Sequence, residues 1–203
     1  MQRYKNIVFD LGNVLIPWQP RWLFNKVFAN DSKKVEWFLQ HVCTPTWNDQ
    51  LDCGKPFKEA VEELTLLFPD YAPQINIYND RWIEMIGTPI VETLAILEEL
   101  KGRKYKILGL SNWSDEKYQL ARDKFEFFKH FEGLIISGQE KVIKPDPKIY
   151  EILLSRYQID AKETIFIDDI AKNIAGAEKF GITGIQFISA KQLREDLQKL
   201  AVL

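Results

Sequence analysis

Three carboxylates in this chain each follow a short apolar run. Asp10 comes directly after Ile7-Val8-Phe9, and Asp168-Asp169 come directly after residues 165–167. Short apolar runs bounded by turn residues are typical of buried strands. The carboxyl ends of parallel strands share one edge of a sheet, where open α/β folds bind ligands. Carboxylates that converge there raise one another's pKa unless a cation joins them, and oxygen ligands of this kind suit Mg²⁺.

Three further residues are of the types that bind an anion. Ser111-Asn112 end the apolar run 107–110 and stand before a helix, so their hydroxyl and amide donors suit the oxygens of an anion. Lys144 precedes Pro145 and adds a point charge suited to a phosphate. Each residue also has a simpler explanation, as a turn residue, a helix cap or a solvated side chain. Their shared placement at strand ends favours a site.

The elements that would position these residues alternate along the chain. Strand patterns cover 6–10, 106–110, 134–136, 164–167 and 184–187, and helical patterns separate them. This alternation predicts an α/β fold, a Rossmann-like parallel sheet with helices on both faces. The stretch from 21 to 88 has helical spacing and no strand signal, with a polar loop expected over 44–54. We therefore expect a core of residues 1–19 and 88–203, with an inserted helical cap of residues 20–87.

Composition limits the class of protein. The chain has 203 residues, 46% of them hydrophobic and 28% charged, with a net charge of -2, which is typical of a globular protein. It has no overall basic field that would attract nucleic acid or acidic lipid, and no apolar run long enough to span a bilayer. Cys43 and Cys53 form no disulfide framework. We expect a cytoplasmic protein with a small-molecule ligand and neither a nucleic-acid nor a membrane partner.

Four short motifs together resemble those of the haloacid dehalogenase-like hydrolase superfamily. They are Phe9-Asp10-Leu11-Gly12-Asn13-Val14, Leu110-Ser111-Asn112, Lys144-Pro145, and Phe166-Ile167-Asp168-Asp169 with Asn173. The motifs occur in the family's order, and the resemblance covers the whole chain, helical cap included. Within the superfamily the chain is most similar to the sugar-phosphatase type, similar to bacterial α-D-glucose-1-phosphate phosphatase, whose first motif also reads Asp-Leu-Gly-Asn.

The resemblance implies a Mg²⁺-dependent phosphatase of small phosphorylated metabolites, with sugar phosphates as the expected substrates. Asp10 would be the nucleophile and form an aspartyl-phosphate that water then cleaves. Lys144 and Mg²⁺ would neutralise the charge of the phosphoryl group. The metal ligands would be Asp10, the Gly12 carbonyl and Asp169, with Asp168 close by or acting through water. Two further implied roles are phosphate binding by Ser111 and Asn112 and orientation of the ligands by Asn173.

Gly12 departs from the family pattern. Many phosphatases of the family carry a second Asp at this position, two residues after the nucleophile, which protonates the leaving alcohol. General acid catalysis is worth about two to four powers of ten in rate. An anomeric hydroxyl is more acidic than an ordinary alcohol, so hydrolysis of a sugar 1-phosphate suffers less from the missing acid. A group from the cap or a metal-polarised water could also replace the acid.

Two alternatives remain open at this point. The 2-haloacid dehalogenases of the family also lack the second Asp, because a halide leaves without a proton. They need no metal, however, and as a rule lack the paired carboxylates seen here as Asp168-Asp169. The second alternative is a phospholigand-binding protein with low turnover, and the presence of Asp10, Lys144 and both acids weighs against it.

Substrate specificity is expected to come from the cap. Caps of this type close over the edge of the sheet and contribute residues from their loops. The polar loop offers Trp47, Asn48 and Asp49 as candidates, and Trp18 and Trp22 follow the first strand closely. Aromatic faces suit sugar rings, although tryptophans in this region also suit the packing of the cap's own helices.

Overall fold

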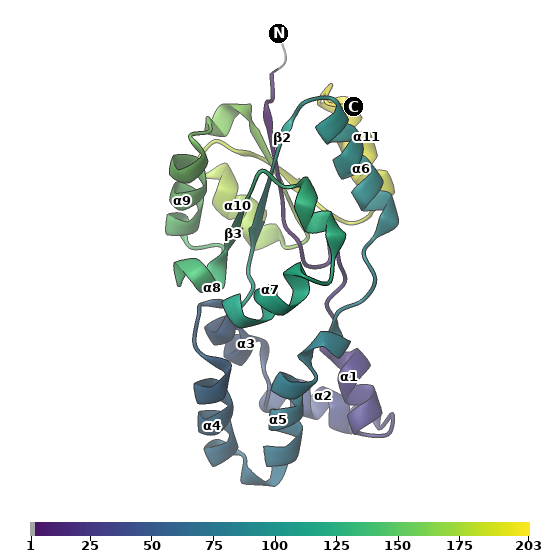
Figure 1. The fold of residues 1–203 in the computed structure, drawn as a ribbon, viewed down its shortest axis with the longest axis vertical. Helices are drawn as coiled ribbons and strands as arrows, with labels where there is room; N and C mark the ends of the chain where they lie inside the picture. The colour runs from purple at the N-terminus through teal and green to yellow at the C-terminus, as the bar shows by residue number, and fades with distance from the viewer. Residues whose placement is uncertain (1–2) are drawn as a thin grey trace.

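The computed structural model describes residues 3–203, which are organised around a five-stranded parallel sheet (Figure 1). The strands are β1 (Asn6–Phe9), β2 (Lys106–Ser111), β3 (Gly133–Ile136), β4 (Thr164–Asp168) and β5 (Thr183–Gln186), in the order β3-β2-β1-β4-β5. Phe9 pairs with Gly109 on one side and with Ile167 on the other. The next residue, Asp10, is therefore placed between the carboxyl ends of β2 and β4.

Alternate residues of each strand face opposite layers of helices, which is the period expected of a sheet covered on both faces. Val8, Leu108 and Phe166 pack with apolar residues of α9 (Pro147–Tyr157) and α10 (Ala171–Glu178). Ile7, Ile107 and Ile165 pack on the other side with α6 (Val91–Gly102) and α11 (Ala190–Lys199). The core is completed by α7 (Asp115–Arg122), η3 (Glu126–His130), α8 (Ser137–Glu140) and η4 (Ala161–Glu163). The predicted Rossmann-like fold class is confirmed.

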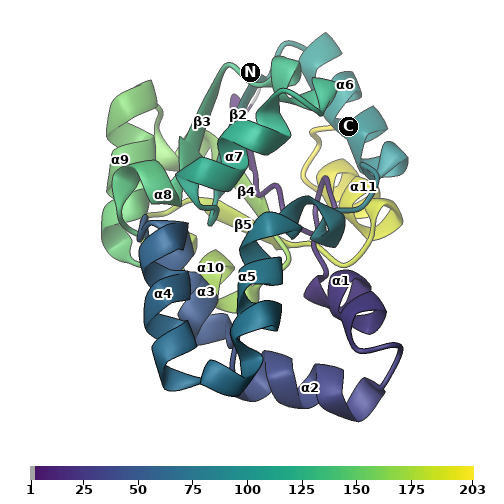
Figure 2. The ribbon, with the colours of Figure 1, turned by 60° about the horizontal axis from the view of Figure 1, so that its bottom comes forward.

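The helices between β1 and α6 form a separate group at the carboxyl edge of the sheet (Figures 1 and 2). They are α1 (Pro20–Val27), α2 (Ser32–His41), α3 (Pro45–Asp52), α4 (Phe57–Leu67), η1 (Pro69–Tyr71), α5 (Ala72–Asp80) and η2 (Trp82–Met85). The chain enters and leaves this group side by side, since Gln19 N donates to Met85 O and Gly87 N donates to Pro17 O. We propose the division 1–19 and 88–203 for the core and 20–87 for the cap.

The polar loop expected over residues 44–54 is wrong, because most of it is helix α3. Thr44 caps this helix by accepting a hydrogen bond from Trp47 N at 3.1 Å, and Pro45 is its first residue. Trp47 and Leu51 are buried one turn apart, so the helix has an apolar face of only two residues. Apart from Pro45 the remaining side chains are polar, so the sequence shows no clear helical pattern of apolar residues here.

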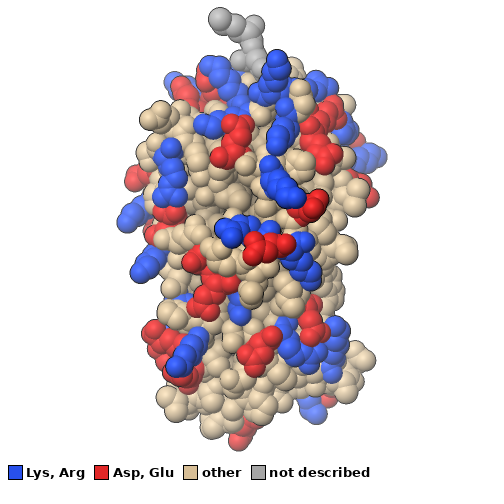
Figure 3. Space-filling view, viewed as in Figure 1, with Lys and Arg blue, Asp and Glu red and all other residues tan. Residues whose placement is uncertain are grey.

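The charges on the surface are mixed. On the face drawn in Figure 3, lysine and arginine side chains alternate with aspartate and glutamate, as the net charge of -2 leads one to expect. Among the described residues, no helix has both the length and the apolar character needed to cross a membrane.

Candidate active site

The structure brings three carboxylates together at the carboxyl edge of the sheet. Asp10 follows β1, Asp168 ends β4 and Asp169 comes next. One carboxylate oxygen from each lies within 4.8 Å of the others. Asp10 and Asp168 are buried and Asp169 is half-buried. Because β1 lies between β2 and β4, the parallel topology alone produces this convergence.

Lys144 lies between two of these carboxylates and is 1% exposed. Its Nζ is 2.9 Å from Asp10 Oδ1 and 2.7 Å from Asp168 Oδ2, and it donates to Leu110 O at 2.8 Å. The ammonium group thus forms hydrogen bonds with Asp168 and Leu110 and an ion pair with Asp10. Burial by itself lowers the pKa of Lys144, but the charges of Asp10 and Asp168 outweigh it and raise that pKa. The lysine is therefore held as a buried cation.

The Asn112 side chain holds Lys144 in place. Its Oδ1 accepts from Lys144 N at 2.8 Å and its Nδ2 donates to Lys144 O at 3.1 Å. Both ends of the amide are thus used on the backbone of the lysine. One of the two Nδ2 protons is used on Lys144 O, and phosphate binding by Asn112 stays a prediction. Ser111 is buried and lies at the surface of the adjoining cavity.

Asp168 and Asp169 differ in how many protein donors they already satisfy. Asp168 accepts from Lys144 Nζ, from Ile170 N at 2.8 Å and from Asn173 Nδ2 at 3.1 Å on both oxygens. Asp169 accepts only a long bond of 3.4 Å from Asn13 Nδ2 among the side-chain donors of the described residues. Asn173 therefore orients Asp168, and Asp169 has more freedom to bind something else.

The electrostatics of Asp10 favour a cation in this site. Burial raises the pKa of Asp10 to about 7, the charge of Lys144 opposes that rise, and the charge of Asp168 adds to it. Burial and the charge of Asp168 also raise the pKa of Asp169. Lys144 forms ion pairs with only two of these three carboxylates, so a further positive charge would favour the state in which all three are ionised. A set of hard oxygen donors fits Mg²⁺.

A cavity of about 530 Å³ separates these groups from the cap. The core contributes the residues of the motifs, and the cap contributes polar and aromatic side chains. The core residues include Asp10, Gly12, Ser111, Asn112, Lys144, Asp169 and Asn173, and the cap residues include Gln40, Asn48, Asp49, Asp52, Tyr78 and Trp82. The cavity is thus closed on one side by the sheet edge and on the other by helices.

The specificity candidates from the sequence are only partly placed at this cavity. Asn48 and Asp49 line it, whereas Trp47 does not. Trp47 is buried inside the cap, where its Nε1 donates to Ala60 O at 3.4 Å and its ring packs edge-on against Tyr78. Asp52 was missed, although residues 48, 49 and 52 share one face of a helix once α3 is recognised.

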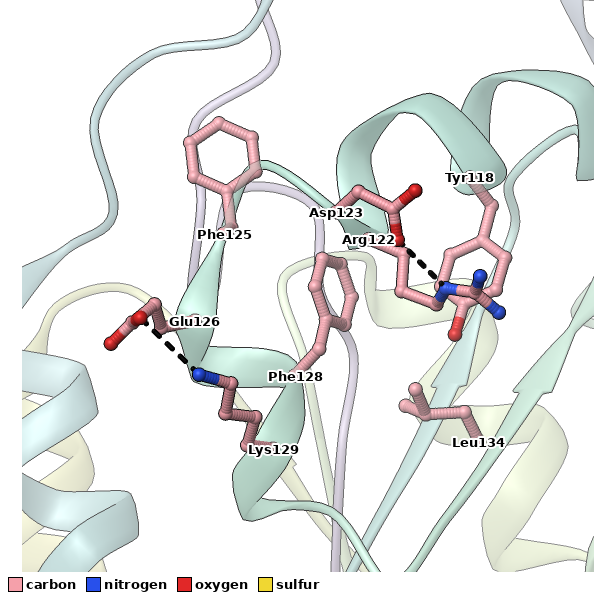
Figure 4. Close-up of a pocket in the computed structure, with 8 residues that line it drawn as sticks. All are labelled: Tyr118, Arg122, Asp123, Phe125, Glu126, Phe128, Lys129 and Leu134. Carbon is pink, nitrogen blue, oxygen red and sulfur yellow. Dashed lines mark hydrogen bonds and ion pairs between the residues drawn. The ribbon is translucent and has the colours of Figure 1, made fainter.

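A second cavity of about 300 Å³ is lined by residues of α7, η3 and β3 and of the segment between α7 and η3 (Figure 4). Its charged residues form two local ion pairs, Arg122–Asp123 at 3.4 Å and Lys129–Glu126 at 3.2 Å. All four side chains are at least half exposed. Exposed pairs of this kind contribute little energy, and none of the converging carboxylates lines this cavity. The chemistry therefore belongs to the larger cavity.

Three comparisons place the chain among known proteins. It is 25% identical over 206 residues to the sesquiterpene phosphatase astK from Aspergillus oryzae, covering 97% of this chain and 96% of that protein. It is 34% identical over 122 residues to the glyceraldehyde 3-phosphate phosphatase from Pyrococcus abyssi, covering 54% of this chain and 51% of that protein. Its fold matches a HAD family enzyme from Bacteroides thetaiotaomicron, crystallised with magnesium and inorganic phosphate, with a TM-score of 0.67 and 24% identity over 90% of this chain and 93% of that chain.

A family model matches the part of the chain that contains the site. This family model is that of the haloacid dehalogenase-like hydrolases, and it matches residues 4–181. The matched span contains all the converging carboxylates, Lys144 and Asn173. On this match, the chain belongs to the haloacid dehalogenase-like hydrolase family.

Proposed function

We propose that this protein is a Mg²⁺-dependent phosphatase of small phosphate esters, in particular sugar phosphates, and that it works through an aspartyl-phosphate on Asp10. The observation that supports the proposal is the contact of Asp10 with a buried lysine, 2.9 Å away, at the wall of a cavity closed by a cap. Phosphatases are among the similar proteins, one of them along nearly the whole chain.

The surroundings of Asp10 suit a nucleophile. Its Oδ1 accepts from Leu11 N at 2.7 Å and contacts Lys144, which together fix the orientation of the carboxylate. Its own N–H donates to Ile167 O at 2.8 Å, which ties the residue to β4. We propose that the carboxylate attacks phosphorus, that Lys144 neutralises the phosphoryl oxygens and that Ser111 donates to one of them.

Mg²⁺ would be held by Asp10, by the Gly12 carbonyl and by Asp169. Asp168 is fully engaged with Lys144, Asn173 and Ile170, so we assign it to a contact through water. When bound, Mg²⁺ offsets the repulsion between the phosphate dianion and the attacking carboxylate. The chain itself positions the oxygen donors: the ends of β1 and β4 place the carboxylates, and Asn173 orients Asp168.

Metal binding should be visible without any turnover. We expect Mg²⁺ to raise the melting temperature of the wild-type protein. At about 100 times its Kd, binding adds about 2.7 kcal/mol. That corresponds to about 5 to 10 °C for a domain of this size. Asp169→Asn should abolish the shift, because it removes the carboxylate with the fewest protein partners. The matched control is Asp70→Asn, an exposed cap residue, which should keep the full shift. Equal shifts in both variants would contradict the assignment of Asp169.

The activity itself is tested by phosphate release from α-D-glucose 1-phosphate and glucose 6-phosphate, each with Mg²⁺ and with EDTA. We expect release that needs Mg²⁺ and stops with EDTA. An isoprenyl monophosphate is a useful third substrate, because Trp18, Trp82 and Ile86 also line the cavity and one similar protein is a sesquiterpene phosphatase. Halide release from a 2-haloacid without metal, and no release from any ester, would replace the proposal by a dehalogenase.

A further inference from the structure

We propose that Asp52, from the cap, is the proton donor for the leaving group and then the base that activates water. This inference rests on the proposed phosphatase function. Gly12 has no side chain at the position where a proton donor would otherwise be expected, so another residue must supply the proton. Asp52 is the last residue of helix α3 and lines the same cavity as Asp10. The carboxyl groups are close enough for the charge of Asp10 to act on Asp52.

Asp52 is held at the contact between cap and core, where α3 meets α8 (Figure 1). Its Oδ2 accepts from Asn48 Nδ2 at 2.8 Å, and the Ser114 backbone acts on its carboxyl group, whose pKa it lowers. Its backbone carbonyl accepts from Ser137 Oγ at 2.6 Å. Asn48 is fixed in turn by the Tyr78 hydroxyl, which donates to its Oδ1 at 2.8 Å. Asp52 is therefore held by both halves of the protein, its carboxylate by the cap and its backbone by the core.

The core segment that receives Asp52 is the one that leads to the phosphate site. Ser114 lies three residues after Ser111, at the start of α7. Trp113 N donates to Ser137 Oγ at 2.9 Å, the same hydroxyl that bonds to the Asp52 carbonyl. A phosphoryl group between Asp10 and Ser111 would have Asp10 on the sheet side and the cap on the other. In an in-line attack the leaving oxygen faces away from the nucleophile, which is toward the cap.

The electrostatic environment keeps Asp52 available as an acid. Burial raises its pKa to about 7, and the charge of Asp49 adds to the rise. The hydrogen bonds from Ser114 and Asn48 oppose the rise, and the charge of Asp10 adds to it. The residue retains partial solvent contact. A carboxyl group with a pKa near the working pH is the kind that general acid catalysis requires.

The proposed proton transfers balance over the two steps. The Asp10 carboxylate bonds to phosphorus while the bond from phosphorus to the leaving oxygen breaks, and that oxygen takes its electron pair and the Asp52 proton. The alcohol leaves neutral and Asp52 becomes a carboxylate. Asp52 then removes a proton from the water that attacks phosphorus, and the bond from phosphorus to Asp10 breaks. The products are the alcohol and inorganic phosphate, with Asp10 ionised and Asp52 protonated again.

The pH dependence follows from the protonated form of Asp52. Among the described residues, the ionisable groups that interact with it include Asp49 on its own helix, Tyr78 on α5 and Asp10, which follows β1. Burial raises the pKa of Tyr78 well above its ordinary value, so the phenol stays neutral across this range. Loss of the Asp52 proton as pH rises past about 7 should lower the rate of the first step for esters with a poor leaving group. This falling limb should be absent in Asp52→Asn.

The experiment compares Asp52→Asn with wild type on two esters in the presence of Mg²⁺. Glucose 6-phosphate has a poor leaving group that needs a proton, whereas p-nitrophenyl phosphate has a leaving group that needs none. For the variant we expect turnover of glucose 6-phosphate to fall by about 10²- to 10⁴-fold. The pre-steady-state burst of nitrophenol should stay near its wild-type rate, while the later hydrolysis step slows. Asp70→Asn is the control for loss of a cap carboxylate and should change neither ester.

A second variant keeps the test decisive if Asp52→Asn is inactive for another reason. A Cβ atom added at Gly12 meets nothing within 4 Å, and Gly12 is not among the residues with a left-handed backbone. Gly12→Asp in the Asp52→Asn background should therefore return part of the turnover of glucose 6-phosphate. Equal loss in the burst and on glucose 6-phosphate, or no loss on either, would overturn the role of Asp52 alone. A wild-type protein inert on every ester would overturn the phosphatase function and this role together.

Discussion

Asp10→Asn is expected to abolish phosphate release, with kcat lower by about 10⁴-fold or more, as for other enzymes that lose their nucleophile. The amide is a poor nucleophile and cannot form the acyl-phosphate bond. The fold should survive, because Asn keeps an oxygen that can accept from Leu11 N at the 2.7 Å position. The measurement is single-turnover phosphate release from p-nitrophenyl phosphate, read together with the nitrophenol burst.

The burst separates the loss of the nucleophile from a general disturbance of the site. Asp10→Asn should show no burst, whereas Asp52→Asn should keep one, since Asp52 is not needed when the leaving group requires no proton. Circular dichroism and the melting temperature give the control for folding. A normal burst in Asp10→Asn would show that another residue is phosphorylated, and the proposed mechanism would fail.

The positions of the catalytic candidates were predictable because they depend on chain topology. An apolar run followed by a polar residue marks the end of a buried strand, and parallel strands place such ends together. Asp10, Ser111 and Asp168 all follow this rule, and the sheet order β3-β2-β1-β4-β5 puts their strands side by side. The cap could be recognised as a helical insertion for a similar reason, since the alternation of strands and helices stops after the first strand and resumes after residue 87.

What could not be predicted depends on contacts between distant segments. Asp52 lines the same cavity as Asp10 in a structure where α3 packs on α8, and no periodicity within the chain predicts that contact. Because most side chains of α3 are polar, the sequence predicted a loop there. Asn48 and Asp52 were therefore not recognised as residues on one face of a helix. The hydrogen bonds between the Asn112 side chain and the Lys144 backbone, 32 residues away, could not be predicted from the residue types. A residue's type shows which groups it offers, while its partner is decided by tertiary packing.

The proposed role of Asp52 also changes the preference expected between a sugar 1-phosphate and a 6-phosphate. The missing side chain at Gly12 favours a sugar 1-phosphate only when no other group supplies the proton. With Asp52 in that role, wild type should hydrolyse the 1-phosphate and the 6-phosphate at more similar rates. Asp52→Asn should then show the strong preference for the 1-phosphate that Gly12 alone would produce. The change in the ratio of the two rates between wild type and Asp52→Asn thus measures how much proton donation by Asp52 contributes to the reaction.

Lys144→Met should both destabilise the protein and remove its activity. Lys144 is buried between Asp10 and Asp168, at 2.9 and 2.7 Å. Removing one partner of a buried ionic group leaves uncompensated charge and costs about 3–5 kcal/mol in the free energy of unfolding. Loss of the positive charge that faces the phosphoryl group should lower kcat by about 10³-fold or more. Denaturant unfolding without Mg²⁺ and phosphate release with Mg²⁺ measure the two effects.

A second substitution separates the structural role of Lys144 from its role in the reaction. In the double variant Lys144→Met with Asp168→Asn, a neutral amide replaces one of the two carboxylates that lost their ion-pair partner. Much of the lost free energy of unfolding should therefore return. The Asn173 amide and the Ile170 N–H can still donate to the oxygen at position 168, which keeps that side chain in place. Activity should stay low, because no cation replaces the ammonium group beside Asp10. Recovery of activity together with stability would mean that Lys144 serves only to neutralise Asp168, and the phosphoryl contact proposed for it would be wrong.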